Sequence, residues 1–343
     1  MRKIKRIFVA VSIIIFTSGL GNGHGTLRFF QVGNFNLESG ETIQDCRVGY
    51  RIFGKLNKDK SNVVLVPTWG NGTTEDFINY NFIAPGSFVD NLKYFVIAVD
   101  AFGNGVSSSP SNSKSQPGQE FPEFIIRDMV NAQYKLLTQE LKMDHILAVV
   151  GLSLGGMQAF QWMVSYPDFM DKVVPIVGTP SMTSYDLIGC QSSLLATKTA
   201  LNCEKNQNLA YQLISTLDAL FMHTPDYYVT HTIPEEFHQA IADSYERIKK
   251  QDLNDIAWQL KAEMKHDIFK QFGGSKEKVI NRIKAKALVI LSQQDHSLNP
   301  SPAIELAKLL NAKTLILKGN GGHLAVFFET DKVIPVLTSF LEE

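Results

Sequence analysis

Cysteine is scarce in this chain, which has only three copies, Cys46, Cys190 and Cys203, among 343 residues. Three cysteines are too few for a disulfide framework, so the core must hold the fold together without one. Cys190 and Cys203 could pair in an oxidising compartment, which would leave Cys46 as a buried free thiol in a strand. No cysteine has the histidine context of a cysteine nucleophile, and cysteine catalysis is not expected.

The chain also lacks an excess of charge of either sign. It has 33 Lys and Arg against 34 Asp and Glu, for a formal net charge of -1. Since no basic stripe follows the N-terminal segment, nucleic acid is not expected as a partner. No pair of histidines has metal-ligand spacing with a cysteine or carboxylate, so we expect neither a metal nor another cofactor. The balance of charge favours a small or apolar substrate.

A long apolar run is missing as well. Ile7 to Phe16 is apolar but too short for a comfortable transmembrane helix. Basic residues precede it and the small residues Ser18 to Gly21 follow it, which is the pattern of a secretory signal peptide within residues 1–25. We expect a mature start near Asn22, a secreted or periplasmic location, and no stable membrane insertion after cleavage. An uncleaved anchor is the alternative.

Beyond this segment, apolar runs of strand length alternate with helical patterns. This alternation predicts an α/β fold with a mostly parallel central sheet and helices on both faces. The first two strands should form an antiparallel edge, and a helix should cover Ile125 to Leu141. The expected strands are residues 27–35, 43–53, 63–66, 94–100, 146–150, 172–177, 287–292 and 314–317.

The strand signal disappears between Ser181 and Gly274. A helix is expected to begin near Pro234, and Ile256, Leu260 and Met264 have the spacing of another. The sequence therefore predicts an α/β core in two parts, residues 26–180 and 275–343, with a helical lid at residues 181–274. Gly273 to Ser275 would be the hinge at the lid's exit, or a simple loop.

The most informative motif is Gly151-Leu152-Ser153-Leu154-Gly155. It follows an apolar strand pattern and precedes a helical one, which indicates a nucleophile elbow. Such a turn needs glycines on both sides of the serine because the backbone is strained and neighbouring elements come close. We therefore expect Ser153 to be the nucleophile. The alternative is a serine in an ordinary tight turn.

A nucleophilic serine needs a base and an acid that orients it. In chains of this layout they follow in the order acid, then histidine, each after a strand. Asp295 and His323 satisfy this order. Asp295 could instead cap the helix expected after Pro302, and His296 is a weak rival for the base. The remaining histidines of the polar helical region are expected at the surface: His223, His231, His238 and His266.

Acyl transfer also requires hydrogen-bond donors for the oxyanion. The main-chain N–H of Leu154, directly after the nucleophile, is one expected donor. The loop after the third strand, Pro67 to Gly72, should supply the other, and Trp69 is the candidate. A plain glycine-rich loop is the alternative.

These motifs resemble the α/β-hydrolase fold and, within it, the homoserine O-acetyltransferase family and its hydrolase-like relatives. The resemblance implies that Ser153, Asp295 and His323 are the catalytic triad. It covers most of residues 40–340 and is carried by four stretches: Asp100 to Asn112, Phe121 to Asp128, Gly151 to Ala159 and Tyr166 to Phe169.

Two positions differ from the acetyltransferases. Those enzymes usually have an aspartate after the catalytic histidine, where it can hold the ammonium group of homoserine, and this chain has Leu324. Their oxyanion loop is typically of the His-Ala-Leu-Thr-Gly type, and Pro67 to Asn71 reads Pro-Thr-Trp-Gly-Asn. Secretion would also separate the protein from acyl-coenzyme A, which is an intracellular donor.

The expected function is that of a secreted serine hydrolase that cleaves a small ester, thioester or lactone through an acyl-enzyme on Ser153. An O-acyltransferase of the homoserine O-acetyltransferase type is the first alternative. The second is a non-catalytic protein that binds an apolar ligand under the lid, against which the complete Ser, Asp and His set argues. The expected partner is a small acyl substrate, and a homodimer is left open.

Overall fold

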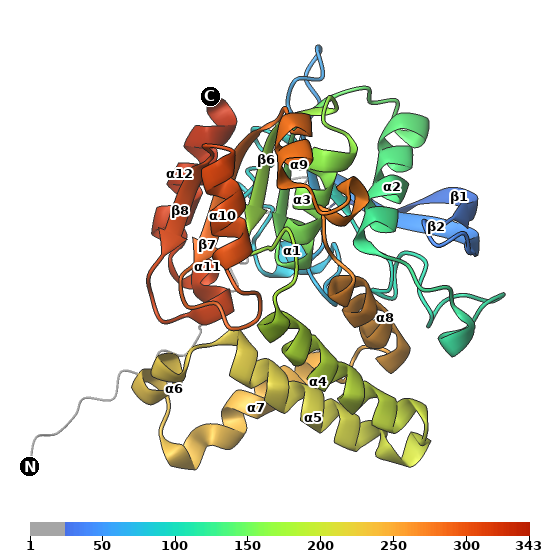
Figure 1. Cartoon of the computed structure of the whole chain (residues 1–343), viewed down its shortest axis with the longest axis vertical. Coiled ribbons are helices and arrows are strands. Elements are labelled where there is room, and N and C mark those ends of the chain that lie inside the picture. Colours follow the sequence, from blue (N-terminus) through green and yellow to red (C-terminus); the bar gives the residue numbers. More distant parts are fainter. Residues whose placement is uncertain (1–24) are drawn as a thin grey trace, which may run out of the picture.

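The structure is a computed structural model that describes residues 25–343, so the expected signal peptide lies outside the described residues. Its centre is a sheet with helices packed around it (Figure 1). The sheet has eight strands in the order β1-β2-β4-β3-β5-β6-β7-β8. The strands are β1 (Arg28–Asn36), β2 (Thr42–Phe53), β3 (Val63–Pro67), β4 (Phe95–Val99), β5 (Ile146–Leu152), β6 (Met170–Ile176), β7 (Lys286–Ser292) and β8 (Lys313–Leu317).

Each expected strand is present, and the predicted fold class is confirmed. β1 pairs with β2, and β2 with β4, in antiparallel register, whereas all other neighbours are parallel. The helices are α1 (Asp76–Asn79), α2 (Ile126–Lys135), α3 (Leu154–Ser165), α4 (Ser184–Leu201), α5 (Gln207–Met222), α6 (Pro225–His231), α7 (Phe237–Ile248), α8 (Leu253–Met264), α9 (Lys276–Arg282), α10 (Ser301–Leu309), α11 (Ala325–Phe328) and α12 (Thr330–Glu342).

The sheet is covered on both faces, as its continuous apolar strands require. In β3, Val63 and Leu65 pack into one hydrophobic cluster, together with residues of α2, α3 and α10. Val64 and Val66 point the other way, into a second cluster with residues of α1, α11 and α12. Because successive side chains of a strand face opposite sides, one short apolar run serves both layers.

The helix before the elbow differs from the expected single α-helix over Ile125 to Leu141. α2 ends at Lys135, and a π-helical turn follows over Leu136–Glu140. The wider turn brings the adjacent residues Leu136 and Leu137 into the core, where both are fully buried.

Helices α4 to α7 form a separate layer at the lower side of the molecule in Figure 1, with α8 between this layer and the sheet. The layer has a small core of its own, built from Ala196, Ala200, Ala210, Ile214, Ile248, Leu253 and Ile256. α8 also contributes Ala257 and Trp258 to the main core. The segments that lead into and out of this region lie side by side, because Ser181 and Asp267 form an antiparallel β-bridge. We refer to α4–α8 as the lid.

The sequence left open whether Cys190 and Cys203 pair, and in the structure all three cysteines are free thiols. About thirteen residues of mostly helical chain, at about 1.5 Å per residue, keep Cys190 and Cys203 too far apart to pair. The expectation for two histidines was wrong. His266 is buried, 4% exposed, and its Nε2 lies 3.0 Å from the carbonyl oxygen of Thr179 at the lid base. His223 is half-buried. Both were expected at the surface from the polar sequence around them.

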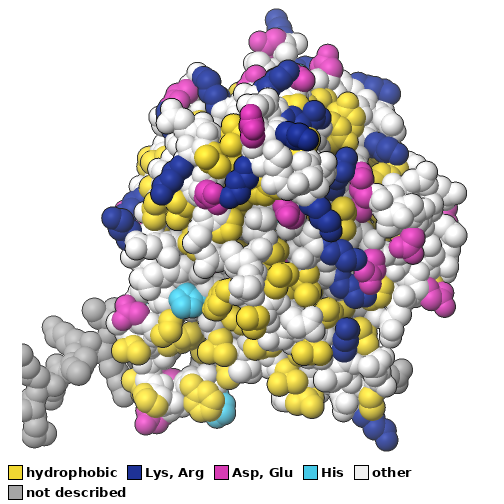
Figure 2. Space-filling view, in the orientation of Figure 1, with side chains coloured by type: hydrophobic (Ala, Val, Ile, Leu, Met, Phe, Trp, Pro, Cys, Tyr) yellow, Lys and Arg dark blue, Asp and Glu magenta, His cyan; other side chains and the backbone are white. Residues whose placement is uncertain are grey.

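The outer face of the lid carries apolar side chains (Figure 2). Exposed examples on α4 and α5 are Ile188, Leu195, Leu209, Leu213 and Leu220. The homodimer left open by the sequence stays a prediction. In residues 25–343 no helix combines the length and apolar character that crossing a bilayer requires.

Candidate active site

Ser153 sits at the sharp turn between β5 and α3, as the motif predicts. Its backbone has φ 57° and ψ −119°, a conformation that side chains rarely adopt. A Cβ atom on Gly151 would lie 2.0 Å from the carbonyl oxygen of Gly155, and one on Gly155 would lie 2.5 Å from that of Pro67. The two glycines are therefore required by close backbone contacts, and the strained turn exposes the serine hydroxyl.

The structure brings the three sequence-predicted residues together. Nε2 of His323 is 2.9 Å from Oγ of Ser153, and Nδ1 is 2.7 Å from Oδ2 of Asp295. The loops after β5, β7 and β8 position them, since the C-terminal ends of parallel strands lie at one edge of the sheet. An imidazole so placed can take a proton from the hydroxyl and remain paired with the carboxylate.

Asp295 is held in place by its own loop. Its Oδ1 accepts hydrogen bonds from the N–H groups of Ser297 and Leu298, at 2.9 Å each. The alternative role as a helix cap is wrong, because α10 begins at Ser301 and Pro300 is its N-cap residue. The carboxylate is thus fixed to orient His323.

The environment of His323 favours its protonated form. Burial of the ring by itself lowers the pKa, but the charge of Asp295 and the hydrogen bond to it outweigh this, so the net pKa is raised. Asp218 and Glu263, two further acids from the lid, act in the same direction. The site therefore stabilises the imidazolium that forms when Ser153 gives up its proton.

The loop after β3 lies beside the first turn of α3, where the second oxyanion donor was expected. Within residues 25–343, neither the N–H of Leu154 nor that of Trp69 donates to a protein acceptor. The Trp69 ring packs against Phe77 and Phe327, with ring centroids 4.9 and 6.4 Å away. Because Phe327 closely follows His323, this packing connects the oxyanion loop with the histidine loop.

A buried amide network that the sequence reasoning did not assign supports the same loop. Trp162 Nε1 donates to Oε1 of Gln133, 2.7 Å away, and Gln133 donates to Oε1 of Gln158, 2.6 Å away. Gln158 in turn donates to the carbonyl oxygen of Thr68, 3.1 Å away. Gln158 belongs to the Gly-Gly-Met-Gln stretch that carried the family resemblance, which was the only signal for it.

The lid is hydrogen-bonded to each of the loops around Ser153. Asp186 of α4 accepts from the N–H of Asn299, beyond Asp295, at 2.8 Å. Thr224, which caps α6, donates to the carbonyl oxygen of Asn320 at 2.7 Å. Gln259 of α8 accepts from the N–H of Asn71 at 2.7 Å. The lid therefore stabilises the loops that carry Asp295, His323 and Trp69.

Glu263, near the end of α8, is a further acid of the site that the sequence reasoning missed. A Cβ atom on Gly70 would lie 3.2 Å from its Oε1 and 3.9 Å from Cβ of Leu154. Its side chain is partly accessible, yet burial is the dominant influence on the carboxyl group and raises its pKa to about 7. Burial therefore favours the neutral form of this carboxyl group.

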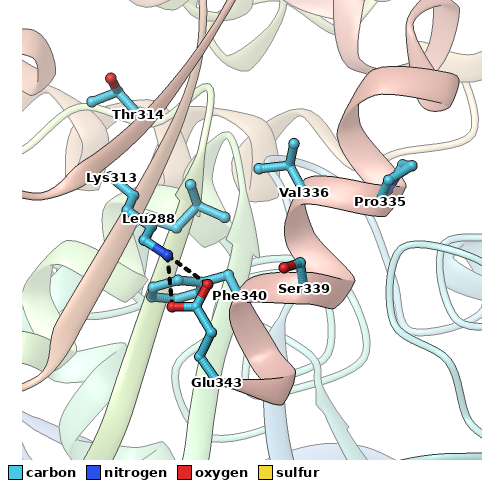
Figure 3. Close-up of a pocket in the computed structure, with 8 residues that line it drawn as sticks. All are labelled: Leu288, Lys313, Thr314, Pro335, Val336, Ser339, Phe340 and Glu343. Atoms are coloured by element: carbon cyan, nitrogen blue, oxygen red, sulfur yellow. Dashed lines mark hydrogen bonds and ion pairs between the residues drawn. The ribbon is translucent and has the colours of Figure 1, made fainter.

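A pocket lies away from Ser153, between β8 and α12 (Figure 3). Leu288, Lys313, Phe340 and Glu343 line it, and Lys313 pairs with Glu343. Lys313 is the first residue of β8, so this pocket lies at the end of the strand opposite to His323. Among residues 25–343, no three His, Cys, Asp or Glu side chains gather as a metal-binding group.

Comparison with known proteins supports the expected family. The profile described as "alpha/beta hydrolase fold" matches residues 62–330. The chain is 28% identical to the ethyl acetate hydrolase of Pseudomonas veronii over 337 residues, which cover 93% of this chain and 95% of that protein. It is 35% identical to a homoserine O-acetyltransferase of Methanohalobium evestigatum over 187 residues, covering 49% of this chain and 38% of that protein.

Solved structures give the same relationship. An acetylester hydrolase from Corynebacterium glutamicum has a TM-score of 0.86 and 27% identity to this chain, covering 93% of it and 96% of that chain. The resemblance to acetyltransferases and their hydrolase relatives is thus confirmed, and the relatives are enzymes on both sides of the hydrolase and transferase division.

Proposed function

The chain belongs to the alpha/beta hydrolase fold family, and we propose that within it the protein is a serine esterase that cleaves short acyl esters. The observation that supports this most is the unbroken contact from Ser153 through His323 to Asp295, at 2.9 and 2.7 Å. The proposal covers small esters, thioesters and lactones, which share an attackable carbonyl group.

In the acylation step, Nε2 of His323 takes the proton of Ser153 as its Oγ attacks the substrate carbonyl. The negative charge that develops on the carbonyl oxygen is held by the N–H groups of Leu154 and Trp69. His323 then gives its proton to the leaving alcohol, and the acyl group remains on Ser153. Asp295 keeps Nδ1 protonated and stabilises the imidazolium throughout.

In the deacylation step, His323 takes a proton from water as the water attacks the carbonyl group of the acyl-enzyme. This attack forms a second oxyanion intermediate. Collapse of this intermediate releases the acid and returns the proton to Ser153. The acyl group is proposed to be short, with acetyl as the starting point, because relatives matched over almost their whole length are named for ethyl acetate and acetyl esters.

Hydrolysis is favoured over transfer to homoserine by the residue after the histidine. Leu324 offers no charge to an amino-acid acceptor at the position where the acetyltransferases usually have an aspartate. The second candidate function, O-acyl transfer, is supported by the acetyltransferase relative. In that reaction a bound alcohol replaces water in the second step.

We also propose that the protein acts outside the cytoplasm, on the basis of the signal-like pattern within residues 1–25. Such a location would favour water over acceptors that depend on acyl-coenzyme A.

The test is a partition experiment with p-nitrophenyl acetate and increasing homoserine. An esterase should convert almost all of the acetyl group to free acetate, and a fluorophosphonate probe should label Ser153. Formation of O-acetylhomoserine at a rate comparable to hydrolysis, with acetyl-coenzyme A as an efficient donor, would establish the transferase instead.

A further inference from the structure

The carboxyl group of Glu263 lacks the protein partners that the other enclosed acids of the described chain have. Its only recorded hydrogen-bond partner among residues 25–343 is the thiol of Cys190, with Sγ 3.9 Å from Oε2. A thiol is a weak donor, and 3.9 Å is a long contact. The acceptor capacity of this carboxyl group is therefore almost unused by the protein.

Other buried acids show the usual arrangement. Asp100 accepts from the N–H and hydroxyl of Thr74 and from the side chain of Asn104. Asp255 accepts from the N–H and hydroxyl of Ser111. These two acids are satisfied by the protein, whereas the partly accessible carboxyl group of Glu263 keeps most of its acceptor capacity for a group from outside the chain. Glu263 differs because it lies beside Gly70 of the oxyanion loop, where a substrate would bind.

The charges around His323 are acidic. Asp295, Asp218 and Glu263 all raise its pKa. Asp295 is paired with His323 itself, and Asp218 is paired with Arg247 and bonded to Ser244. Glu263 is thus the acid of this group that has neither an ion pair nor a strong hydrogen bond within the described chain.

We propose that Glu263 binds a hydrogen-bond donor on the substrate, a hydroxyl or an ammonium group, and so selects esters that carry one near the scissile bond. This inference rests on the proposed esterase function and names its substrate class. Binding by Glu263 should also favour amino alcohols over amino acids. Glu263 can pair with an ammonium group, whereas the α-carboxylate of homoserine would meet the acidic charges around His323.

The selection should depend on pH. The pKa of Glu263 is raised to about 7, first by burial, while His323 acts in the opposite direction. The titratable groups that face it are His323 from the loop after β8 and Cys190 from α4. Preference for a cation should therefore increase as the pH rises through about 7, because the carboxylate form becomes populated.

A matched pair of esters tests this. 3-(Dimethylamino)propyl acetate carries a tertiary ammonium group whose N–H can donate and which stays protonated up to pH 8, and 4-methylpentyl acetate is its neutral isostere. Turnover of both esters depends on the same titration of His323, so this dependence cancels in the ratio of their kcat/KM values. In the wild type this ratio should rise between pH 6 and pH 8. In Glu263→Gln it should be flat and lower at pH 8 by roughly tenfold or more, since a charge-assisted contact is lost.

The hydroxyl class is tested with 2-hydroxyethyl acetate against n-propyl acetate. Glu263→Gln retains an acceptor and should keep part of the preference for the hydroxyl ester, whereas Glu263→Leu should lose it. Glu246→Gln is the matched control, because Glu246 is an exposed lid acid paired with Lys249. Thermal melting and the rate of fluorophosphonate labelling check that each variant is folded with an intact Ser153.

The outcomes separate this inference from the function beneath it. A fall in either ratio in the Glu263 variants, without one in Glu246→Gln, supports the inference and identifies the donor. If the acetyl esters are hydrolysed but both ratios stay within about twofold of the wild type, Glu263 does not select the substrate and the inference is overturned. If the wild type hydrolyses none of the esters and resists the probe, the esterase function itself is overturned.

Discussion

Gln158 of α3 donates a hydrogen bond to the carbonyl oxygen of Thr68, 3.1 Å away, and is itself fully buried. The carbonyl of Thr68 and the N–H of Trp69 belong to one planar peptide group, so fixing the carbonyl also fixes the direction of the N–H. A side chain on the helix of the nucleophile thereby orients the proposed second oxyanion donor.

Gln158→Met tests this positioning role. Methionine has a similar size but cannot donate to Thr68, so the Trp69 peptide should lose its alignment. We expect kcat for p-nitrophenyl acetate to fall roughly ten- to a hundredfold with little change in KM, because an oxyanion contact acts mainly in the transition state. Steady-state kinetics measures both constants.

Gln161→Met is the control for that variant. Gln161 is also buried on α3, but in the described part of the chain its side chain bonds only to Ser165 on the same helix. Equal losses of kcat in both variants, matched by equal losses of melting temperature, would make Gln158 a purely structural residue.

Ser153→Ala and His323→Ala should each abolish turnover of short acyl esters while leaving the fold intact. Asp295→Asn should lower kcat by a few orders of magnitude, because it disturbs the tautomer of His323. The Ser153 and His323 double variant should be little worse than either single variant, since the residues act as a unit. A loss of less than about tenfold in Ser153→Ala would remove Ser153 from the nucleophile role.

The pH dependence should report the base. His323 must be neutral to accept the proton, and its pKa is raised above the ordinary 6.5 by Asp295 despite burial. For a neutral ester, kcat/KM should therefore be low in acid and rise through a midpoint above 6.5. Because the pKa of Glu263 is about 7, this rising part of the pH profile should reflect the coupled titration of His323 and Glu263.

Glu263→Gln should separate the two titrations. Removing this negative charge takes away one influence that raises the pKa of His323, so the midpoint should move to lower pH. A midpoint that moves upward, or that stays fixed in both Glu263→Gln and Asp295→Asn, would contradict the electrostatic account of the site.

His266 should make the protein sensitive to acid. Burial lowers its pKa to about 4 from 6.5, and the folded state keeps it neutral. Between these values the unfolded chain binds the extra proton, so stability should decrease as the pH falls from 6.5 towards 4. The full effect is about 3 kcal/mol.

Urea unfolding at pH 7 and pH 4.5 measures this effect. The loss of unfolding free energy between the two pH values should be smaller in His266→Gln than in the wild type, while exposed His238→Gln should match the wild type. The comparison removes the contribution of other acid-sensitive groups that all three proteins share.

The proposed location has a direct test. Protein recovered from its source cell should lack about its first twenty residues and be found outside the cytoplasm, because the N-terminal pattern is that of a cleaved signal. Intact protein that begins at Met1 in a soluble cytosolic fraction would refute this proposal and strengthen the transferase alternative.

Strands and the elbow were predictable from local sequence. The run Val63 to Val66 is apolar at every position, and only a strand buried on both faces uses all four side chains. The glycines around Ser153 were informative because the turn forbids side chains there on steric grounds. Asp295 and His323 could be predicted because each follows a strand, and the C-terminal ends of parallel strands lie at one edge of the sheet.

What covers these loops depended on tertiary structure. His266 lies among polar residues and looked exposed, but the lid base buries it against Thr179. Glu263 follows helical periodicity like any surface acid, and it enters the site only because α8 docks beside Gly70. Local composition determines whether a segment forms a strand, a turn or a helix. Which distant residues then surround a charged side chain, and so set its pKa and its chemistry, is decided only when the helices pack.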